Sequence, residues 1–170
     1  MAMNTGELAS TLTTLFSELV SGANNPGGAF ILNTGDIGLL RSLDKLPADH
    51  ASHASQGGAT IAAHARHLAY GLSLMNRWAR EGGNPFADAT WDAAWKTSAV
   101  DDREWADIRR ALGAETKEWL AHLAKPRDVT PAELHGMVGS IAHLAYHLGA
   151  IRQIDRTARG PKDGNYSTSG

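Results

Sequence analysis

The segment Ser140–Asp155, SIAHLAYHLGAIRQID, has the periodicity that decides the fold class. Its apolar residues recur every three or four positions, which is typical of an amphipathic helix. His143 and His147 are four residues apart, so a helix places both imidazoles on one side. At about 100° per residue they lie on the shoulder of an apolar stripe that centres near Ile141 and Leu148. This position predicts a pair of imidazoles facing a groove at the edge of a helical core.

Three other segments show the same periodicity between helix start and stop signals. Together with the first, they predict long helices over residues 5–20, 60–80, 101–123 and 130–156. Capping-box spacing marks three of the starts: Asn4 with Glu7, Asp101 with Glu104, and Thr130 with Glu133. Shorter helical turns are expected in residues 36–43 and around Trp91 and Trp95, whereas residues 47–58 have the composition of a loop.

These elements predict an all-α fold, namely a four-helix bundle with long first and second connections. The bundle domain is expected to cover residues 1–157, and the polar, Gly-rich segment 158–170 is expected to be a disordered tail. Because bundles commonly bury a remaining apolar face by self-association, we also expect a homodimer.

The composition excludes several classes of function. With 170 residues, of which 42% are hydrophobic and 20% charged, the chain can bury a core as one globular domain. A net charge of −2 offers no basic surplus for nucleic acid, and no apolar run approaches the roughly 20 residues of a membrane span. The N-terminus lacks the pattern of a secretory signal, so we expect a cytoplasmic location. Without cysteine, a bound metal must use histidine or carboxylate ligands.

Two further histidines, His64 and His67, lie in the segment HARHL of the helix expected over residues 60–80. An H-x-x-x-H pair can chelate one ion, since zinc–imidazole bonds are about 2.0–2.1 Å long. A third histidine from another helix would leave a coordination position open for water or substrate, as in catalytic sites. The alternative is that all these histidines are ordinary core or surface residues held by hydrogen bonds, and periodicity alone leaves both interpretations open.

Two stretches resemble the DinB/YfiT-like superfamily of small metal-binding four-helix bundles. Residues Thr60–Leu72, TIAAHARHLAYGL, are similar to the superfamily's HLA segment, and Ala142–Ile151, AHLAYHLGAI, are similar to its H-x-x-x-H-x-G-Q-I segment. Length, helix count and long connections agree over almost the whole chain before the tail. The resemblance implies a divalent metal, zinc or nickel, bound by His67, His143 and His147, because His67 directly precedes the Leu-Ala pair.

The chain departs from the superfamily pattern at two positions. Ala150 stands where the usual glutamine follows the motif glycine, so that residue's role is absent or filled elsewhere. His64 is additional, and three roles are open to it: a partner that orients a ligating histidine, a substitute ligand, or a buried neutral histidine.

The resemblance also implies a chemistry. Some members are transferases or isomerases that use low-molecular-weight thiols such as bacillithiol or mycothiol. We therefore expect a metal-dependent enzyme of the thiol S-transferase or hydrolase type that acts on a small molecule. Since the chain has no cysteine, a nucleophilic sulfur would arrive with a thiol cosubstrate. The alternatives are a non-catalytic metal- or ligand-binding bundle and a purely structural bundle with buried histidines.

Several other residues are candidates for supporting roles. Glu115 and Ser140 could orient a metal-bound histidine, although Glu115 could equally be a surface ion-pair partner. Arg152 could bind an anionic substrate or form a salt bridge at the rim. Four aromatic residues could wall an apolar substrate pocket or simply fill gaps between helices: Trp78, Phe86, Trp91 and Trp95.

Overall fold

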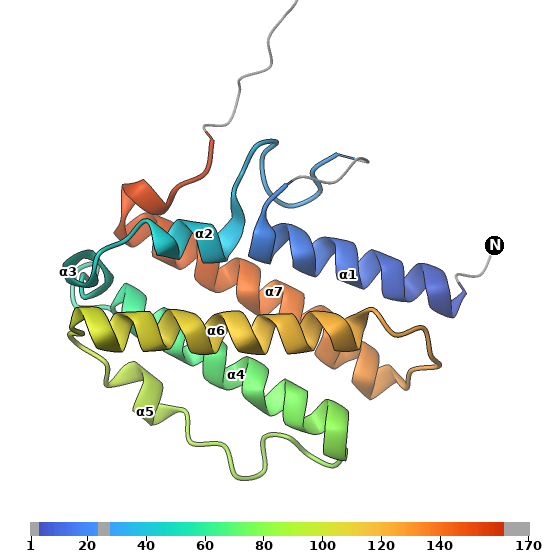
Figure 1. The fold of residues 1–170 in the computed structure, drawn as a ribbon. Coiled ribbons are helices and arrows are strands. Elements are labelled where there is room, and N and C mark those ends of the chain that lie inside the picture. The colour runs from blue at the N-terminus through green and yellow to red at the C-terminus, as the bar shows by residue number, and fades with distance from the viewer. Residues whose placement is uncertain (1–3, 24–27, 162–170) are drawn as a thin grey trace, which may run out of the picture.

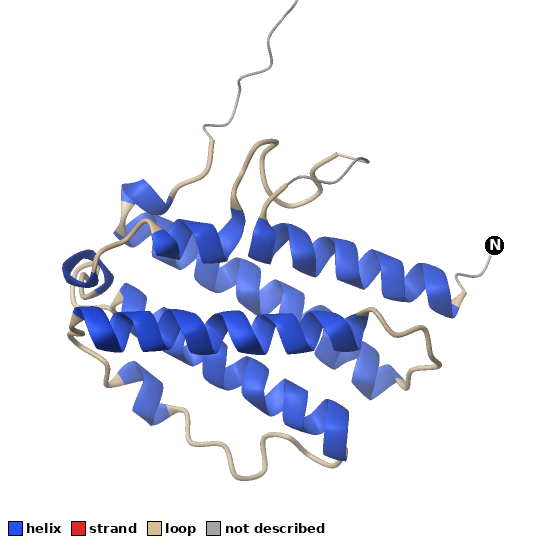
Figure 2. Ribbon diagram, in the orientation of Figure 1, coloured by secondary structure: helices blue, strands red, loops and turns tan. Residues whose placement is uncertain are grey.

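The computed structural model describes residues 4–23 and 28–161, and these residues form helices and no strand (Figures 1 and 2). In chain order the elements are α1 (Thr5–Ser21), α2 (Gly38–Asp44), α3 (Ala48–Ala51), α4 (Ile61–Glu81), α5 (Asp92–Trp95), α6 (Asp102–Leu123), α7 (Pro131–Ile154) and the 3-10 helix η1 (Arg156–Ala158). The predicted all-α class is therefore confirmed for the described residues. None of these helices combines the length and apolarity needed to cross a membrane.

The long helices α1, α4, α6 and α7 lie where the hydrophobic periodicity predicts them, and local hydrogen bonds explain where they begin. At α7, Thr130 Oγ1 accepts from the backbone N–H of Glu133 (3.2 Å), and the Glu133 carboxylate accepts from the backbone N–H of Thr130 (2.7 Å). The same reciprocal pair begins α1 and α6, and Thr60 caps α4 by accepting from Ala63 N–H. These side chains satisfy backbone donors that have no partner within the helix.

Two short regions add detail to the sequence expectation. The segment expected to be a loop contains α3, a single turn that forms because Ala48 and Ala51 are buried against the core. The chain also stays packed past residue 157, since Ala158 is fully buried and Arg159 Nε donates to the Arg152 carbonyl (2.9 Å). Residues 162–170, which make up the rest of the predicted tail, lie outside the described residues.

Both α4 and α1 pack against α6 and against α7. In Figure 1, α4 and α6 run in one direction, whereas α1 and α7 run in the opposite direction. Because α4 and α6 are parallel neighbours, the chain must return along their length, and residues 82–101 make that return. The helices enclose a core containing Phe16, Trp105 and Trp119, where the Trp105 indole N–H donates to the Leu46 carbonyl (2.7 Å).

Side chains of α4 hold the connection between α4 and α6 through an ion pair and hydrogen bonds. Arg77 forms an ion pair with Asp88 (2.6 Å) and donates to the Pro85 carbonyl (2.9 Å). The Tyr70 hydroxyl accepts from the backbone N–H of Thr90 (2.9 Å), and α5 then packs against α4. These contacts hold the aromatic residues of the connection beside α4, where the candidate site lies.

Candidate metal centre

Four histidines from two helices meet where α4 packs against α7. His64 and His67 lie on α4, and His143 and His147 lie one turn apart on α7. Nε2 of His143 is 3.0 Å from Nε2 of His67 and 3.0 Å from Nε2 of His147. His67, His143 and His147 each place a ring nitrogen within 4.8 Å of the other two, an arrangement that could hold a metal ion. The structure thus brings together the three histidines named from the resemblance, here called the histidine triad.

The chemistry of the triad fits a cation better than a hydrogen-bond network. Each nitrogen of a neutral imidazole offers either one N–H or one lone pair. Because Nε2 of His143 faces two other ring nitrogens, it can complete a good hydrogen bond with only one of them. A divalent cation would accept a lone pair from all three nitrogens at once, and three histidine ligands leave a fourth position open.

His64 contacts the triad from its outer side. Its Nδ1 lies 2.8 Å from Nδ1 of His147, while the other nitrogen of His147 faces His143. If Nε2 of His147 binds an ion, Nδ1 of His147 carries the proton and can donate a hydrogen bond to Nδ1 of His64. Such hydrogen bonds orient ligating imidazoles. Among the three roles open to His64, this geometry matches that of an orienting partner. Nδ1 of His67, in contrast, is buried without a hydrogen-bond partner among the described residues.

The surroundings keep the four imidazoles neutral. Burial, together with smaller effects of His143 and His64, lowers the pKa of His67 to about 4. Burial, again the largest cause, lowers the pKa of His147 to about 3 together with the neighbouring histidines. The pKa values of His64 and His143 are also lowered by burial. Since a metal binds neutral imidazole, the triad at pH 7 needs to release no proton before it binds an ion.

Two tryptophans from the connection after α4 cover one side of the histidines. The Trp95 ring stacks on His67, with centroids 4.3 Å apart, and meets His64 edge-on at 5.5 Å. The Trp91 ring lies 5.3 Å from His67. With this cover, His67 is 7% exposed and His147 is 3% exposed. A site with so little water around it strengthens electrostatic interactions with any ion it holds.

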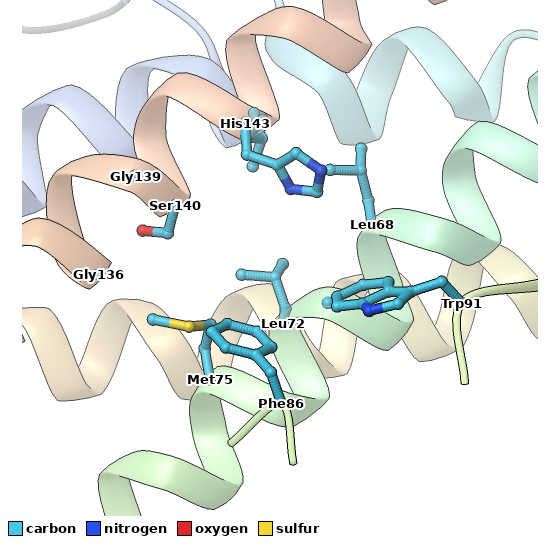
Figure 3. Close-up of a pocket in the computed structure, with 11 residues that line it drawn as sticks. Leu68, Leu72, Met75, Phe86, Trp91, Gly136, Gly139, Ser140 and His143 are labelled. Carbon is cyan, nitrogen blue, oxygen red and sulfur yellow. The ribbon is translucent and has the colours of Figure 1, made fainter. Parts of the chain in front are cut away.

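A pocket of about 440 Å³ adjoins the triad, and His143 is part of its lining (Figure 3). The pocket lies between α4 and α7, and the connection after α4 closes a third side. Its larger apolar side chains come from α4, from α7 and from that connection: Leu68, Leu72, Met75, Phe86, Trp91 and Leu144. The histidine triad and the pocket therefore share His143, and tryptophans of the connection after α4 contact both.

Two residues proposed from the sequence to orient a metal-bound histidine have other partners. Ser140 lines the pocket, but its hydroxyl accepts from the Trp119 indole (2.9 Å) and donates to the Met137 carbonyl (2.7 Å). The Glu115 carboxylate accepts from the Asn76 side chain (2.7 Å) where α4 contacts α6. Within the described residues, neither side chain hydrogen-bonds to a histidine of the triad.

The remaining candidates are divided between different places. Phe86 and Trp91 line the pocket, whereas Trp95 covers the histidines. Trp78 lies outside the pocket lining and packs over Gly136, where an added Cβ would come within 2.6 Å of its ring. Arg152 lies at a separate polar cavity and forms an ion pair with Asp36 (2.8 Å).

Three glycines in the pocket lining stand outside the sequence predictions. Gly71 is on α4, and Gly136 and Gly139 are on α7. Their spacing was an available signal, because Gly136, Gly139 and His143 recur at three and four residues and so share one face of α7. Small residues on the face that carries a candidate ligand indicate open space beside it.

Comparisons with known proteins leave the interpretation to this geometry. The chain matches no protein-family model, no curated protein and no solved structure.

Proposed function

We propose that this chain is a divalent-metal-dependent enzyme of the DinB/YfiT-like class of four-helix bundles. In this proposal the histidine triad binds zinc or nickel, and the enzyme transfers a low-molecular-weight thiol to a small electrophilic substrate. The observation that carries the proposal is the convergence of three neutral imidazoles, with Nε2 of His143 lying 3.0 Å from Nε2 of both other histidines. The all-helical fold, in which both α1 and α4 pack against α6 and α7, also supports it.

The absence of cysteine from the sequence bears on the choice of nucleophile. Because the chain supplies no thiol of its own, the reactive sulfur must arrive with a cosubstrate. A divalent ion with an open position supplies Lewis acidity, which lowers the pKa of a thiol and yields a thiolate at neutral pH.

The chain's own residues hold and shield this site. His64 fixes the ring of His147 through the contact between their Nδ1 atoms (2.8 Å). Trp95 stacks on His67 and limits the approach of water from that side. Burial keeps the imidazoles in the neutral form that ligates a metal.

The partners of the histidines favour thiol transfer over hydrolysis. In the described part of the chain, the four rings hydrogen-bond to one another and to no carboxylate. Hydrolysis by metalloenzymes commonly uses a carboxylate as the general base for the attacking water, as in the H-E-x-x-H class. A thiol needs less help, because its ordinary pKa of about 8.5 is much closer to neutral pH than that of water.

Metal binding tests the proposal directly. We expect isothermal titration calorimetry to show one Zn²⁺ or Ni²⁺ per chain and no binding to the variant H143A/H147A. The matched control is H53A/H135A, which also removes two histidines but from exposed positions outside the cluster. If the wild type binds neither metal better than H143A/H147A does, the proposal fails.

A transfer assay tests the chemistry. Zinc- or nickel-loaded protein is given 1-chloro-2,4-dinitrobenzene and 2-mercaptoethanol; the sulfur bonds to the ring carbon, chloride leaves with the C–Cl electron pair, and the thiol proton passes to buffer. We expect metal-dependent thioether formation that H143A/H147A loses and H53A/H135A keeps. Metal-dependent cleavage of 4-nitrophenyl acetate without thioether formation would instead assign a hydrolase.

A further inference from the structure

The pocket between α4 and α7 opens onto the histidine triad through His143. Figure 3 shows the His143 ring at one end of the pocket, with Leu68 and Trp91 near it and Met75 and Phe86 farther along. Trp91 belongs to both places, because it lines the pocket and lies 5.3 Å from the His67 ring. A molecule in the pocket would therefore have one end beside the proposed metal.

The lining offers little to a charged ligand. Within the described part of the chain, no Asp, Glu, Lys or Arg lines this pocket. The Ser140 hydroxyl is already engaged by the Trp119 indole and the Met137 carbonyl, and Nε2 of His143 faces the rings of His67 and His147. Burying a charge among apolar walls is unfavourable without a partner, so the pocket selects an uncharged molecular body.

Glycines keep this space open. A Cβ at Gly139 would meet nothing within 4 Å, and a Cβ at Gly71 would lie 3.7 Å from Cε1 of His143 and 3.9 Å from the Trp91 ring. A larger side chain at Gly71 would thus stand at the junction of pocket and triad. Glycine is less favourable than alanine inside a helix, so both positions lose helix stability while leaving the pocket unfilled.

The mouth of the pocket has an exposed aromatic ring. Phe86 is 48% exposed, although the connection that bears it is fastened to α4 by Arg77. The cavity of about 440 Å³ lies within the range of about 300–1,000 Å³ that is typical of small-molecule sites. An apolar ligand would cover Phe86 and remove more apolar surface from water.

We propose that this pocket binds the uncharged, apolar body of the substrate, aromatic or branched aliphatic, and directs its reactive end to the triad at His143. The inference rests on the proposed metal-dependent function, and it adds the substrate class to it. The substrate is then an apolar electrophile rather than a sugar, a nucleotide or a carboxylate-rich metabolite.

Two hydroxamates that share a metal-binding head test the inference. Benzohydroxamate carries a phenyl body and acetohydroxamate carries only a methyl group. Titrated into the zinc-loaded full chain, benzohydroxamate should bind at least about tenfold more tightly, because its ring buries apolar surface in the pocket. The variant G139L, which projects a side chain into the open space, should lose this preference and keep its affinity for acetohydroxamate.

The variant G149L is the matched control. Gly149 lies on the same helix, and a Cβ there also meets nothing within 4 Å, but it lines the separate polar cavity near Arg152. It should keep the tenfold preference. Equal binding of both hydroxamates to zinc-loaded wild type overturns the pocket inference and leaves the metal proposal standing. Failure of wild type to bind zinc overturns the metal proposal itself, and the calorimetry identifies it before any hydroxamate is added.

Discussion

Two buried polar groups lie along α7, and they are built in opposite ways. Near the C-terminal end, Arg152 Nη2 bonds to Oδ1 of Asp36 (2.8 Å), which also accepts from Gly38 N–H (2.8 Å), and Arg152 Nε donates to the Ala158 carbonyl (3.1 Å). Opposite charges meet there with their partners in place. Earlier on α7, imidazole nitrogens of the histidine triad face one another instead of an opposite charge. In addition, Nδ1 of His67 has no hydrogen-bond partner among the described residues.

The two groups differ in whether opposite charges or like groups face one another. The Asp36–Arg152 pair is complete within the chain and joins α7 to the segment that begins α2. The triad brings three ring nitrogens together and has no carboxylate hydrogen-bonded to its rings among the described residues, an arrangement that could hold a metal ion. Four experiments test this difference between the two groups, and the expected effect is largest for acid.

Acid should act most strongly on the triad. In the folded protein the pKa values are about 4 for His67 and about 3 for His147, both lowered from 6.5. Below about pH 6.5 the unfolded chain therefore binds more protons, so stability is complete above that pH and falls as pH decreases toward 4. At pH 5 the loss is about 2 kcal/mol per histidine, or about 4 kcal/mol together.

Urea unfolding of metal-free protein at pH 7.5 and pH 5 measures this loss. The variant H67Q/H147Q retains hydrogen-bonding side chains that do not titrate. Between pH 7.5 and pH 5, the free energy of unfolding of the wild type should fall by about 4 kcal/mol more than that of this variant. Equal losses in the two proteins would show that the folded triad accepts protons as readily as the unfolded chain.

Breaking the Asp36–Arg152 ion pair should lower the free energy of unfolding by nearly as much, while leaving zinc affinity unchanged. The variant R152M leaves the Asp36 carboxylate buried and without its charged partner, which should destabilise the fold by about 3 kcal/mol or more. Zinc affinity should stay within about twofold. Chemical denaturation and calorimetry give the two numbers. A large loss of zinc or substrate affinity with intact stability would return Arg152 to the site, as a group that binds an anionic substrate.

Removing His64 should weaken zinc binding to the histidine triad without abolishing it. We propose that His64 orients His147 through the 2.8 Å contact between their Nδ1 atoms. On that basis H64F should reduce zinc affinity by about 10–100-fold, equivalent to about 1.4–2.7 kcal/mol. H53F is the control at an exposed histidine. If H64F abolishes zinc binding, His64 is a ligand; if it changes nothing, His64 is a buried neutral histidine without a role at the metal.

Replacing glycine by alanine should change stability in opposite directions at Gly139, which lines the pocket beside the triad, and at Gly160, which lies beside Asp36. G139A should stabilise the protein by about 0.5–1 kcal/mol, because the new Cβ meets open space and alanine favours a helix. G160A should destabilise the protein, since a Cβ at residue 160 would overlap the Asp36 carboxylate that pairs with Arg152. Thermal melting of the two variants tests the difference. Stabilisation by both changes would show that the ion pair is loosely packed.

The sequence predicts much of the fold because the helix signals are local. Capping boxes such as Thr130 with Glu133 form as expected, since their partners are three residues apart in the chain. The turn of α3 is different, because the burial of Ala48 and Ala51 depends on helices distant in sequence. The candidate site shows the same division. The spacing of His143 and His147 identifies two of the three triad histidines, whereas helical periodicity leaves His64 and His67 equally open. Only the resemblance, through the Leu-Ala pair that follows His67, favours His67.

By itself, the sequence determined an all-helical chain, the positions of its long helices, the exclusion of thiolate ligands, and two imidazoles on one side of the last long helix. The resemblance named His67, and it is the packing of α4 against α7 that brings His67 to those imidazoles and places His64 against Nδ1 of His147. The tertiary structure also separated Trp91 and Phe86, which line the pocket, from Trp78, which packs over Gly136. The physical reason is that helical periodicity sets the angle of a side chain around its own axis, whereas the depth and rotation at which two helices meet depend on packing of the whole core.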